Sequence, residues 1–216
     1  YNSFWLSYSS YNTMSGNNIT NNRSGIMLDY SSFNSISENI IEANDADGIL
    51  LDNSLNNTIS RNNITANNLY AIRLLYSSYH NRIFHNNFVK NQAVSFGYGS
   101  LWDNGYPSGG NYWSDYNGTD LYSGPYQNET GSDGIGDTPY IINEDNADDY
   151  PLTNPWSWHD IAVVEVIPSR SWVYQGHSFN INITVLNEGD FAERVTVALY
   201  YNMTANQVIG TQTITL

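Results

Sequence analysis

Residues 25–41 read GIMLDYSSFNSISENII, and residues 48–64 read GILLDNSLNNTISRNNI. The two stretches carry apolar residues and asparagines at the same positions, and one further copy lies on each side of them. Successive copies are 22 to 24 residues apart, which is the length of one solenoid turn and too short for a domain. The equivalent apolar residues form four columns: Phe4, Ile26, Ile49 and Ile72; Leu6, Leu28, Leu51 and Leu74; Met14, Ile36, Ile59 and Ile83; Ile19, Ile41, Ile64 and Phe88.

The apolar residues within each copy are spaced as in a strand. Pairs such as Ile26 and Leu28 lie two residues apart, and no stretch carries the longer-period stripe of an amphipathic helix. Asn, Ser and Gly interrupt the apolar residues every few positions, as in turns. Leucine-rich repeats have a similar period, but their helical arm is missing here. The pattern predicts an all-β fold, a parallel β-helix of about four to five coils with a coil spacing of about 4.8 Å.

Asparagines recur in step with the apolar columns. One set consists of Asn17, Asn39, Asn62 and Asn86. Two more sets follow the same spacing: Asn12, Asn34, Asn57 and Asn81, and Asn22, Asn44, Asn67 and Asn91. Because a parallel β-helix places equivalent residues directly above one another, we expect these amides to form hydrogen-bonded ladders. The fixed phase of the asparagines relative to Ile and Leu argues against a disordered polar tract.

The composition excludes several kinds of partner. The chain has 216 residues and a formal net charge of −14, and it lacks the cations that would neutralise the phosphates of a nucleic acid. An anionic membrane surface is disfavoured for the same reason, and without an apolar run of membrane length we expect no direct membrane insertion. The absence of cysteine leaves the redox compartment open. Residue 1 falls inside a repeat, so we expect this chain to be a piece of a longer protein.

Acceptor sequons for N-glycosylation occur along the whole chain. They lie at Asn18, Asn22, Asn56, Asn63, Asn117, Asn128, Asn182 and Asn202. A chain rich in Asn, Ser and Thr forms some sequons by chance. Their density, together with the aromatic content and the near absence of lysine, nevertheless favours a secreted or cell-surface protein.

Three regions differ in composition. Residues 1–96 hold the β-helix repeats, and residues 97–157 form a Gly-, Tyr-, Trp- and Asp-rich segment that we predict to cap the coils. Residues 158–216 predict an immunoglobulin-like β-sandwich, joined to the cap near residues 155–158. Its predicted strands are 161–166, 178–185 and 194–200. These are too few to close a sandwich, so we expect a partial module.

The repeat resembles that of a known group of proteins. Its pattern G-I-x-L-x-x-S-x-x-N-x-I-x-x-N-x-I is similar to the NosD-like, carbohydrate-binding and sugar-hydrolase (CASH) group of right-handed β-helix proteins. The segments GNYWSDY (110–116), DGIGDTPY (133–140) and DYPL (149–152) resemble the region that closes many archaeal NosD-like surface proteins. The resemblance implies a right-handed β-helix and an exported, surface-associated protein. Activities in the group are mostly unassigned.

The end of the chain carries a second resemblance. The segments DIAV (160–163) and VLNEG (185–189) are similar to CARDB-type adhesion modules. Such modules imply an immunoglobulin-like fold and an adhesive role. The two resemblances together cover nearly the whole chain.

The name of the NosD-like group refers to copper delivery to a periplasmic reductase. Copper sites draw on clustered Cys, Met or His, whereas this chain has no cysteine, three Met and four His. Only His80 and His85 lie near each other. His85 shares its column position with Glu38 and Arg61, which predicts a surface position in a charged ladder. We therefore expect no copper.

An acidic turn in the cap predicts a different cation. Asp133 and Asp137 lie four residues apart, glycines let the backbone turn tightly, and Ile135 offers a carbonyl oxygen. Asp115 and Asp120 add oxygens for Ca²⁺, which takes about six to eight oxygen ligands in irregular geometry. Further acidic residues nearby are Glu144, Asp145, Asp148 and Asp149. The EF-hand spacing is absent, and the alternative is a solvated acidic turn, but we predict a structural calcium ion.

A second acidic pair predicts an alternative, enzymatic function. Asp29 and Asp52 follow equivalent leucines, so they should stack outward on adjacent coils about 5 Å apart. This separation matches the paired carboxylates of retaining glycosidases. The neighbouring coils offer Ser7 and Leu75 at this position, and no basic residue is obvious beside them. The alternative function is a polysaccharide hydrolase or lyase on the β-helix flank, with the two Asp residues as acid and nucleophile.

Aromatic residues recur at one turn of the coil. Tyr8, Tyr30 and Tyr76 form one set, and a second set consists of Tyr11, Phe33 and Tyr79. The rings could stack on sugars or on a partner's surface, or else cover the edge of the solenoid. We expect a non-enzymatic, exported structural or adhesion protein, a rigid rod that binds glycans or neighbouring subunits. Assembly into a homo-oligomer, filament or surface layer is a further expectation.

Overall fold

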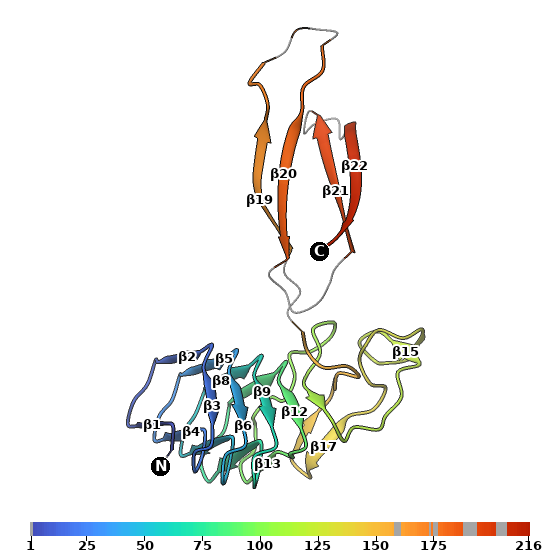
Figure 1. The fold of residues 1–216 in the computed structure, drawn as a ribbon. Coiled ribbons are helices and arrows are strands. Elements are labelled where there is room, and N and C mark those ends of the chain that lie inside the picture. Colours follow the sequence, from blue (N-terminus) through green and yellow to red (C-terminus); the bar gives the residue numbers. More distant parts are fainter. Residues whose placement is uncertain (1, 158–160, 173, 175–176, 188–193, 202–206) are drawn as a thin grey trace. The chain divides into compact units, whose positions relative to one another are not determined.

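The computed structural model describes residues 2–157, 161–172, 174, 177–187, 194–201 and 207–216. It divides into two compact units, Tyr1–Trp156 and Ser157–Leu216 (Figure 1). Every regular element among the described residues is a β-strand, and none of these residues forms a helix long and apolar enough to cross a membrane. The sequon at Asn202 lies outside the described residues.

Three parallel sheets form the β-helix of the first unit, with one strand of each sheet in almost every coil. The first sheet contains β1 (Phe4–Ser7), β4 (Ile26–Asp29), β7 (Ile49–Asp52), β10 (Ile72–Leu75) and β13 (Val94–Ser95). The second contains β2 (Thr13–Ser15), β5 (Ser35–Ser37), β8 (Thr58–Ser60) and β11 (Arg82–Phe84). The third contains β3 (Asn18–Thr20), β6 (Ile40–Glu42), β9 (Asn63–Thr65), β12 (Asn87–Val89) and β14 (Tyr112–Trp113). The predicted all-β parallel β-helix is therefore confirmed, with about five coils.

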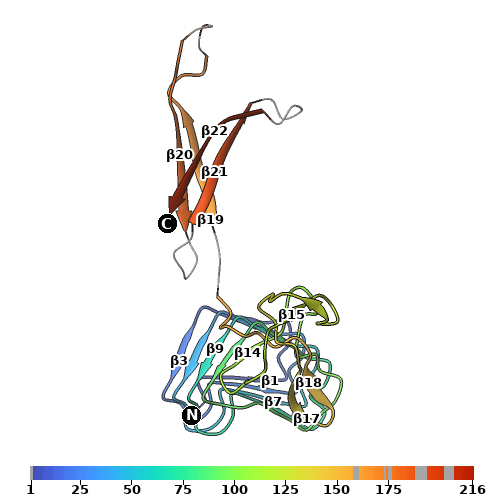
Figure 2. The same ribbon diagram turned by 90° about the vertical axis from the view of Figure 1, so that its right-hand side faces the viewer.

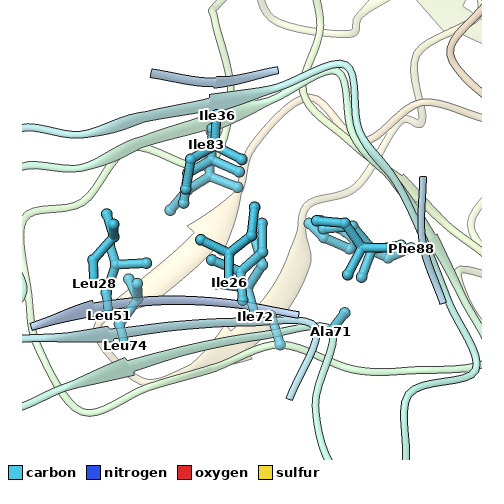
Figure 3. Close-up of a cluster of buried hydrophobic side chains, with 14 of the residues drawn as sticks. Ile26, Leu28, Ile36, Leu51, Ala71, Ile72, Leu74, Ile83 and Phe88 are labelled. Carbon is cyan, nitrogen blue, oxygen red and sulfur yellow. The ribbon is translucent and has the colours of Figure 1, made fainter. Parts of the chain in front are cut away.

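The four apolar columns fill the interior of the coils. Ile26, Ile49 and Ile72 are fully buried, as are most of the equivalent Leu and Ile residues (Figure 3). The strands pair Ile26 with Ile49 and Ile49 with Ile72, so like side chains pack on one another from coil to coil. Burial of each such side chain stabilises the fold by roughly 1.5–3 kcal/mol. These columns are the hydrophobic core of the first unit.

Each coil bends where a residue adopts positive φ, and we call these residues corner residues. In the first four coils they occupy equivalent positions: Tyr8, Tyr11, Gly16 and Asn21; Tyr30, Phe33, Glu38 and Ala43; Asn53, Asn56, Arg61 and Ala66; Tyr76, His80, His85 and Lys90. This conformation costs a non-glycine residue roughly 1–2 kcal/mol. Because most corner residues are not glycine, other interactions must hold the corners.

Asparagine ladders supply those interactions at three of the four corners. Asn62 is representative: its Oδ1 accepts hydrogen bonds from the backbone N and the Nδ2 of Asn39, at 3.0 and 2.9 Å. Its own N and Nδ2 donate to Asn86 Oδ1, at 3.0 and 2.9 Å. Asn62 Nδ2 also donates to the carbonyl oxygens of Ile36 and Ser60. Asn17, Asn39, Asn62 and Asn86 thus form one continuous ladder along the coils.

The fifth coil extends past residue 96, where the repeat pattern ends in the sequence. Leu101 bridges to β11, and β14 pairs with β12. Trp102 and Trp113 take the core positions that follow Ile83 and Phe88, and both indole rings are buried. A loop between the two tryptophans hides this coil from a repeat search. The large rings close the end of the hydrophobic core.

The ladder that contains Asn62 ends on a carboxylate. Asn86 donates to Asn111 Oδ1, and the backbone N of Asn111 donates to Asp148 Oδ2 at 2.7 Å. Trp113 Nε1 donates to the same oxygen at 2.9 Å. Since every ladder amide donates in the same direction, the last one needs an acceptor, which a carboxylate provides. Burial raises the pKa of Asp148 to about 7, although hydrogen bonds from Trp113 and Asn111 lower it.

Irregular chain after the fifth coil packs on the end of the β-helix (Figure 2). It contains two antiparallel pairs, β15 (Tyr122–Ser123) with β16 (Glu129–Thr130), and β17 (Tyr140–Asn143) with β18 (Asn146–Asp148). Tyr140 stacks on Trp113, with ring centroids 4.1 Å apart. Asn146 Oδ1 accepts a hydrogen bond from Trp102 Nε1 at 3.2 Å. The cap therefore contacts both tryptophans of the last coil.

The described residues of the second unit form two antiparallel strand pairs. These are β19 (Ile161–Pro168) with β20 (Ile181–Asn187), and β21 (Arg194–Tyr201) with β22 (Gln207–Thr215). Apolar side chains of Ile183, Val197 and Ile214 line a common groove. The strand β22 is not among the predicted strands. The unit is all-β, and a complete immunoglobulin-like topology stays a prediction.

Candidate functional site

Four turns, one in each of the first four coils, join the first sheet to the second. They read YSSY at residues 8–11, YSSF at 30–33, NSLN at 53–56 and YSSYH at 76–80. We call this set of turns the aromatic corner. Each turn begins and ends with a corner residue of positive φ. The rings at these ends are exposed, while one serine in each of the last three turns is buried.

Buried serines fix the aromatic corner from the inside. Ser31, Ser54 and Ser78 are fully buried. The backbone N of Ser31 donates to Ser54 Oγ at 3.0 Å, and that of Ser54 donates to Ser78 Oγ at 3.2 Å. The hydroxyls of Ser31 and Ser54 donate to backbone carbonyls of their own coils. This serine ladder bonds successive coils as the asparagine ladders do. Serine recurs in the sequence at these turns, but the burial pattern is needed to recognise a ladder.

The outer residues of the first two turns form two stacks of rings. Tyr8 and Tyr30 have centroids 5.0 Å apart with 6° between their planes, and Tyr11 and Phe33 have centroids 5.2 Å apart with 6°. The separation is close to the coil spacing of about 4.8 Å, so stacking follows from the strand register. Tyr8 and Tyr11 are nevertheless 78% and 79% exposed. The paired faces cover each other, so each stack presents its ring edges and its two outer faces to a partner.

The fourth turn is one residue longer than the others, and this moves one predicted ring. Asn56 N donates to the carbonyl oxygen of Tyr79 at 3.4 Å, which places His80 next to Asn56. His80 also has the positive φ of a corner residue. The predicted alignment of Tyr79 with Tyr11 and Phe33 is therefore corrected to His80. The ring of Tyr79 instead stacks on Tyr98 of the fifth coil, with centroids 6.1 Å apart.

The acidic pair lies directly beside the aromatic corner. Asp29 and Asp52 are in register on β4 and β7, with Ser7 and Leu75 on the neighbouring strands. Ser7 Oγ donates to Asp29 Oδ2 at 3.1 Å, and Asn53 Nδ2 donates to Asp52 Oδ1 at 2.8 Å. The ion pairs found among the described residues involve other carboxylates. Each carboxylate of the pair therefore has a neutral hydrogen-bond donor.

The column of Glu38, Arg61 and His85 is exposed at one end and buried at the other. Arg61 pairs with Glu38 at 3.4 Å near the surface. His85, predicted to lie on the surface, is instead buried against Trp156, with ring centroids 3.6 Å apart and 3° between the planes. Its Nε2 lies 2.8 Å from the carbonyl oxygen of Ser108. Burial lowers the pKa of His85, although the hydrogen bond to Ser108 opposes the shift.

Comparison with known protein families adds an independent result. The family described as periplasmic copper-binding protein (NosD) matches residues 1–118, more than half of the 216 residues. The chain belongs to the NosD family. Membership supports a right-handed β-helix and is consistent with an exported location. No curated protein and no solved structure matches the chain.

Copper, which the NosD family name implies, does not fit the donor atoms of this chain. Copper sites are built from clustered Cys, Met or His. The chain has no cysteine, Met14 is buried in the core, and His85 lies beneath Trp156. Within the described residues, no group of three or more His, Asp or Glu side chains is close enough to share a metal ion. We derive no copper chemistry for this NosD-family chain.

The residues predicted to hold calcium are engaged in hydrogen bonds. Asp137 accepts from two backbone N–H groups and a threonine hydroxyl, and although burial raises its pKa, these hydrogen bonds lower it overall. Asp120 accepts from a serine hydroxyl and two backbone N–H groups. Asp133 accepts from Ile135 N at 3.1 Å, and Asp115 accepts from a tyrosine hydroxyl. These bonds order the acidic segment, and calcium at these residues stays a prediction.

Most sequon asparagines of the described residues are exposed. The exposed ones are Asn18, Asn56, Asn63, Asn117, Asn128 and Asn182. Asn22 is half-buried, and its Nδ2 donates to the carbonyl oxygen of Thr20 at 2.9 Å. A glycan on Asn22 would disturb this bond. Glycosylation of the exposed sequons stays a prediction.

A polar groove of about 530 Å³ runs along another corner of the NosD-type β-helix. It is lined by residues 66–70 and 90–92 together with Ser114 and Asp115. Lys90 and Gln92 contribute polar groups from the fourth coil. The groove arises from the packing of three successive coils and the start of the cap. No motif within a single repeat signals it.

Proposed function

We propose that this NosD-family chain is a non-enzymatic, exported protein of an archaeal-type cell surface, in which the β-helix is a rigid rod. The aromatic corner binds surface glycans or neighbouring protein subunits. The second unit adds a CARDB-like adhesion module. The observation that carries the proposal is the pair of exposed ring stacks, Tyr8 on Tyr30 and Tyr11 on Phe33.

Exposure and rigidity together support this role. Large contiguous apolar patches on soluble proteins mark interaction surfaces, and aromatic rings contribute much contact area with few rotatable bonds. The serine ladder and the strand register hold the rings about one coil spacing apart, about 4.8 Å. A rigid row of rings suits a partner that is itself extended, such as a glycan chain or a second rod.

The test compares ring removal at the corner with ring removal elsewhere. Tyr8→Ser combined with Tyr11→Ser takes one ring from each stack, and Tyr126→Ser removes an 83% exposed ring of the cap as the matched control. Binding of the full chain to neutral and acidic polysaccharides is measured together with self-association by sedimentation velocity. We expect at least a tenfold loss of binding or association in the double variant alone. Unchanged behaviour of the double variant in both assays would refute the role of the corner.

A second candidate function is cleavage of a polysaccharide at Asp29 and Asp52. It is favoured by the direct register of the two carboxylates, whose strand spacing of about 5 Å fits a retaining mechanism. The assay follows new reducing ends and unsaturated products from acidic and neutral polysaccharides. Cleavage that disappears in Asp29→Asn and in Asp52→Asn would make the pair an active site. If none of the polysaccharides is cleaved, the cleavage hypothesis is rejected and the non-enzymatic surface role is retained.

We also propose that a structural calcium ion binds the cap. Asp115, Asp120, Asp133 and Asp137, with the carbonyl of Ile135, carry oxygens of the kind that Ca²⁺ prefers. In this structure no three of these carboxylates lie close enough to share an ion, so binding would have to draw them together. Binding would offset repulsion among these carboxylates. The midpoint of thermal unfolding should rise in millimolar calcium relative to EDTA, and Asp133→Asn should abolish the rise. Equal midpoints for the unaltered chain in calcium and in EDTA would end the proposal.

A further inference from the structure

One column of the aromatic corner lacks a ring in the third coil. Tyr8, Tyr30, Asn53 and Tyr76 each follow strand residues that pair in register. Their φ values are 49°, 46°, 47° and 46°. Equal φ and strand register place these residues at equivalent points of successive coils, and the rings of Tyr8 and Tyr30 stack on each other there. At Asn53 an amide stands where the column predicts a ring.

The second column is interrupted in the same coil. Tyr11, Phe33, Asn56 and His80 have φ values of 62°, 58°, 53° and 57°. Tyr11 and Phe33 stack on each other, and Asn56 follows them in the column. Both columns therefore resume with a ring in the fourth coil. We call the turn at residues 53–56, with the rings on either side of it, the ring gap.

The ring gap is one ring wide. Rings two coils apart are separated by twice the coil spacing, about 9.6 Å. A flat group placed midway would lie about 4.8 Å from each neighbour, close to the 5.0 Å that separates Tyr8 from Tyr30. Tyr30, which Tyr8 covers on one face, is 51% exposed, and Tyr76 is 71% exposed. Both flanking tyrosines therefore have ring surface free for a third ring.

The base of the ring gap is polar. Asn53 Nδ2 donates to Asp52 Oδ1 at 2.8 Å, and an amide and a carboxylate each have hydrogen-bonding capacity beyond this one bond. Asn56 adds an exposed amide. An aromatic ring from a partner would cover these groups without bonding to them, at a cost of roughly 1–3 kcal/mol for each unsatisfied group. A sugar ring combines C–H faces that stack on aromatic rings with hydroxyls that bond to amides and carboxylates.

We propose that the ring gap binds a single pyranose ring of an external saccharide, stacked between Tyr30 and Tyr76. Asp52, Asn53 and Asn56 hydrogen-bond to its hydroxyl groups. The inference rests on the proposed function, because the saccharide is part of the surface glycan that the corner binds. It is more specific, since it assigns the sugar to one coil and leaves the stacked rings of the first coil outside the site.

The test uses the full chain made in a host that attaches no N-glycans, so that Asn56 carries no sugar of its own. The probes are the methyl glycosides of glucose, galactose, mannose and N-acetylglucosamine, with binding followed by saturation-transfer NMR and titration. Asn53→Tyr completes the column of rings and should lower affinity at least tenfold. Tyr76→Ala removes one flanking ring and should lower it at least fivefold. Tyr126→Ala removes an exposed ring of the cap, outside the aromatic corner, and as the matched control it should stay within twofold.

Each outcome separates the ring gap from the proposed function. Equal affinity in Asn53→Tyr and the unaltered chain would overturn the ring gap, as would a loss in Tyr126→Ala as large as that in Tyr76→Ala. Absence of binding for all four probes would also overturn it. In each of these cases the polysaccharide-binding and self-association measurements on the corner still decide the proposed function. Should Asn53→Tyr fail to fold, the comparison of Tyr76→Ala with Tyr126→Ala carries the test alone.

Discussion

The asparagine corners and the aromatic corner share one backbone conformation, but the repeated side chain is buried at the first and exposed at the second. In both, a residue of positive φ is followed by one that bonds to the next coil, as in Arg61 with Asn62 and Tyr30 with Ser31. At the asparagine corner the repeated side chain is the buried amide. At the aromatic corner the conspicuous repeated side chain is the exposed ring. Strict repetition in the sequence therefore has two different physical causes.

Whether a repeated side chain is needed by the fold can be judged from the coils in which the repeat is interrupted. The ladder through Asn62 continues without a break from the first coil to Asn111. The ring column breaks at Asn53, yet β7 keeps its register with both neighbours and Ser54 keeps its ladder bonds. The fold thus does not require the ring. A repeat that the fold does not require points to binding.

The largest effect is expected from breaking the buried ladder. Asn62→Ala removes an amide that bonds to Asn39, Asn86 and two carbonyl oxygens, all of them buried. Each buried group left without a partner costs roughly 1–3 kcal/mol, so we expect a loss of about 4 kcal/mol or more in the free energy of unfolding. Urea denaturation followed by circular dichroism measures it. The control Asn18→Ala, an exposed asparagine of β3, should change stability by less than about 0.5 kcal/mol.

A similar loss in both variants would contradict the ladder's role. It would mean that asparagine contributes through strand propensity or solvation rather than through bonds between coils. A small loss in both would show that neighbouring amides or water replace the missing bonds.

The second largest loss of stability is expected when the cation of a buried ion pair is removed, in contrast to the cation of an exposed ion pair. Asp47 is fully buried and pairs with Arg73, and burial raises the pKa of Asp47 although Arg73 lowers it. Arg73→Met leaves the carboxylate buried without its cation, which should cost about 3 kcal/mol. Arg61→Met, at the exposed pair with Glu38, should cost less than about 1 kcal/mol. Equal losses in urea denaturation would show that burial does not decide the value of these pairs.

Titration at the end of the buried ladder gives the third effect. The folded pKa of Asp148, about 7, lies above its ordinary value of 3.8, because the carboxyl is buried. The folded chain then holds a proton that the unfolded chain has released, so stability falls as pH rises, by roughly 2 kcal/mol between pH 5 and pH 7. Asp148→Asn keeps an acceptor oxygen for Asn111 and removes this fall.

Urea denaturation at several pH values compares the two chains directly. His85 contributes in the opposite direction, since its lowered pKa reduces stability as pH falls through its ordinary value. That contribution is present in both chains and cancels in the difference. Identical pH profiles would show that Asp148 is ionised throughout this range.

The sequence predicts features that depend on one repeat and its period. The core columns and the asparagine ladders belong to this class, because parallel register stacks equivalent residues. The repeat does not predict contacts that join distant segments. Examples are the stacking of Trp156 on His85 and the hydrogen bond from Asn111 to Asp148 that ends the ladder. A one-residue insertion in the fourth turn was enough to misplace Tyr79. In the candidate site, the rings were predictable from their spacing, and the serine ladder beneath them required the burial pattern.

The smallest effect on stability is expected from removing an exposed ring of the aromatic corner. Tyr30→Ala removes one ring from the stack with Tyr8 but leaves Ser31 and its ladder bonds in place. A stacked pair contributes roughly 0.5–1.5 kcal/mol when well buried, and Tyr30 is 51% exposed, so we expect a loss below about 1 kcal/mol. Urea denaturation beside Asn62→Ala measures the difference between the two corners.

Binding should respond in the reverse order. Tyr30 flanks the ring gap and belongs to a ring stack, so its removal should weaken association with a glycan or a second subunit although the chain stays folded. A loss of stability as large as that in Asn62→Ala would instead make the ring part of the structural framework. Exposure at the aromatic corner would then no longer argue for a binding surface, because the fold itself would account for the repeated rings.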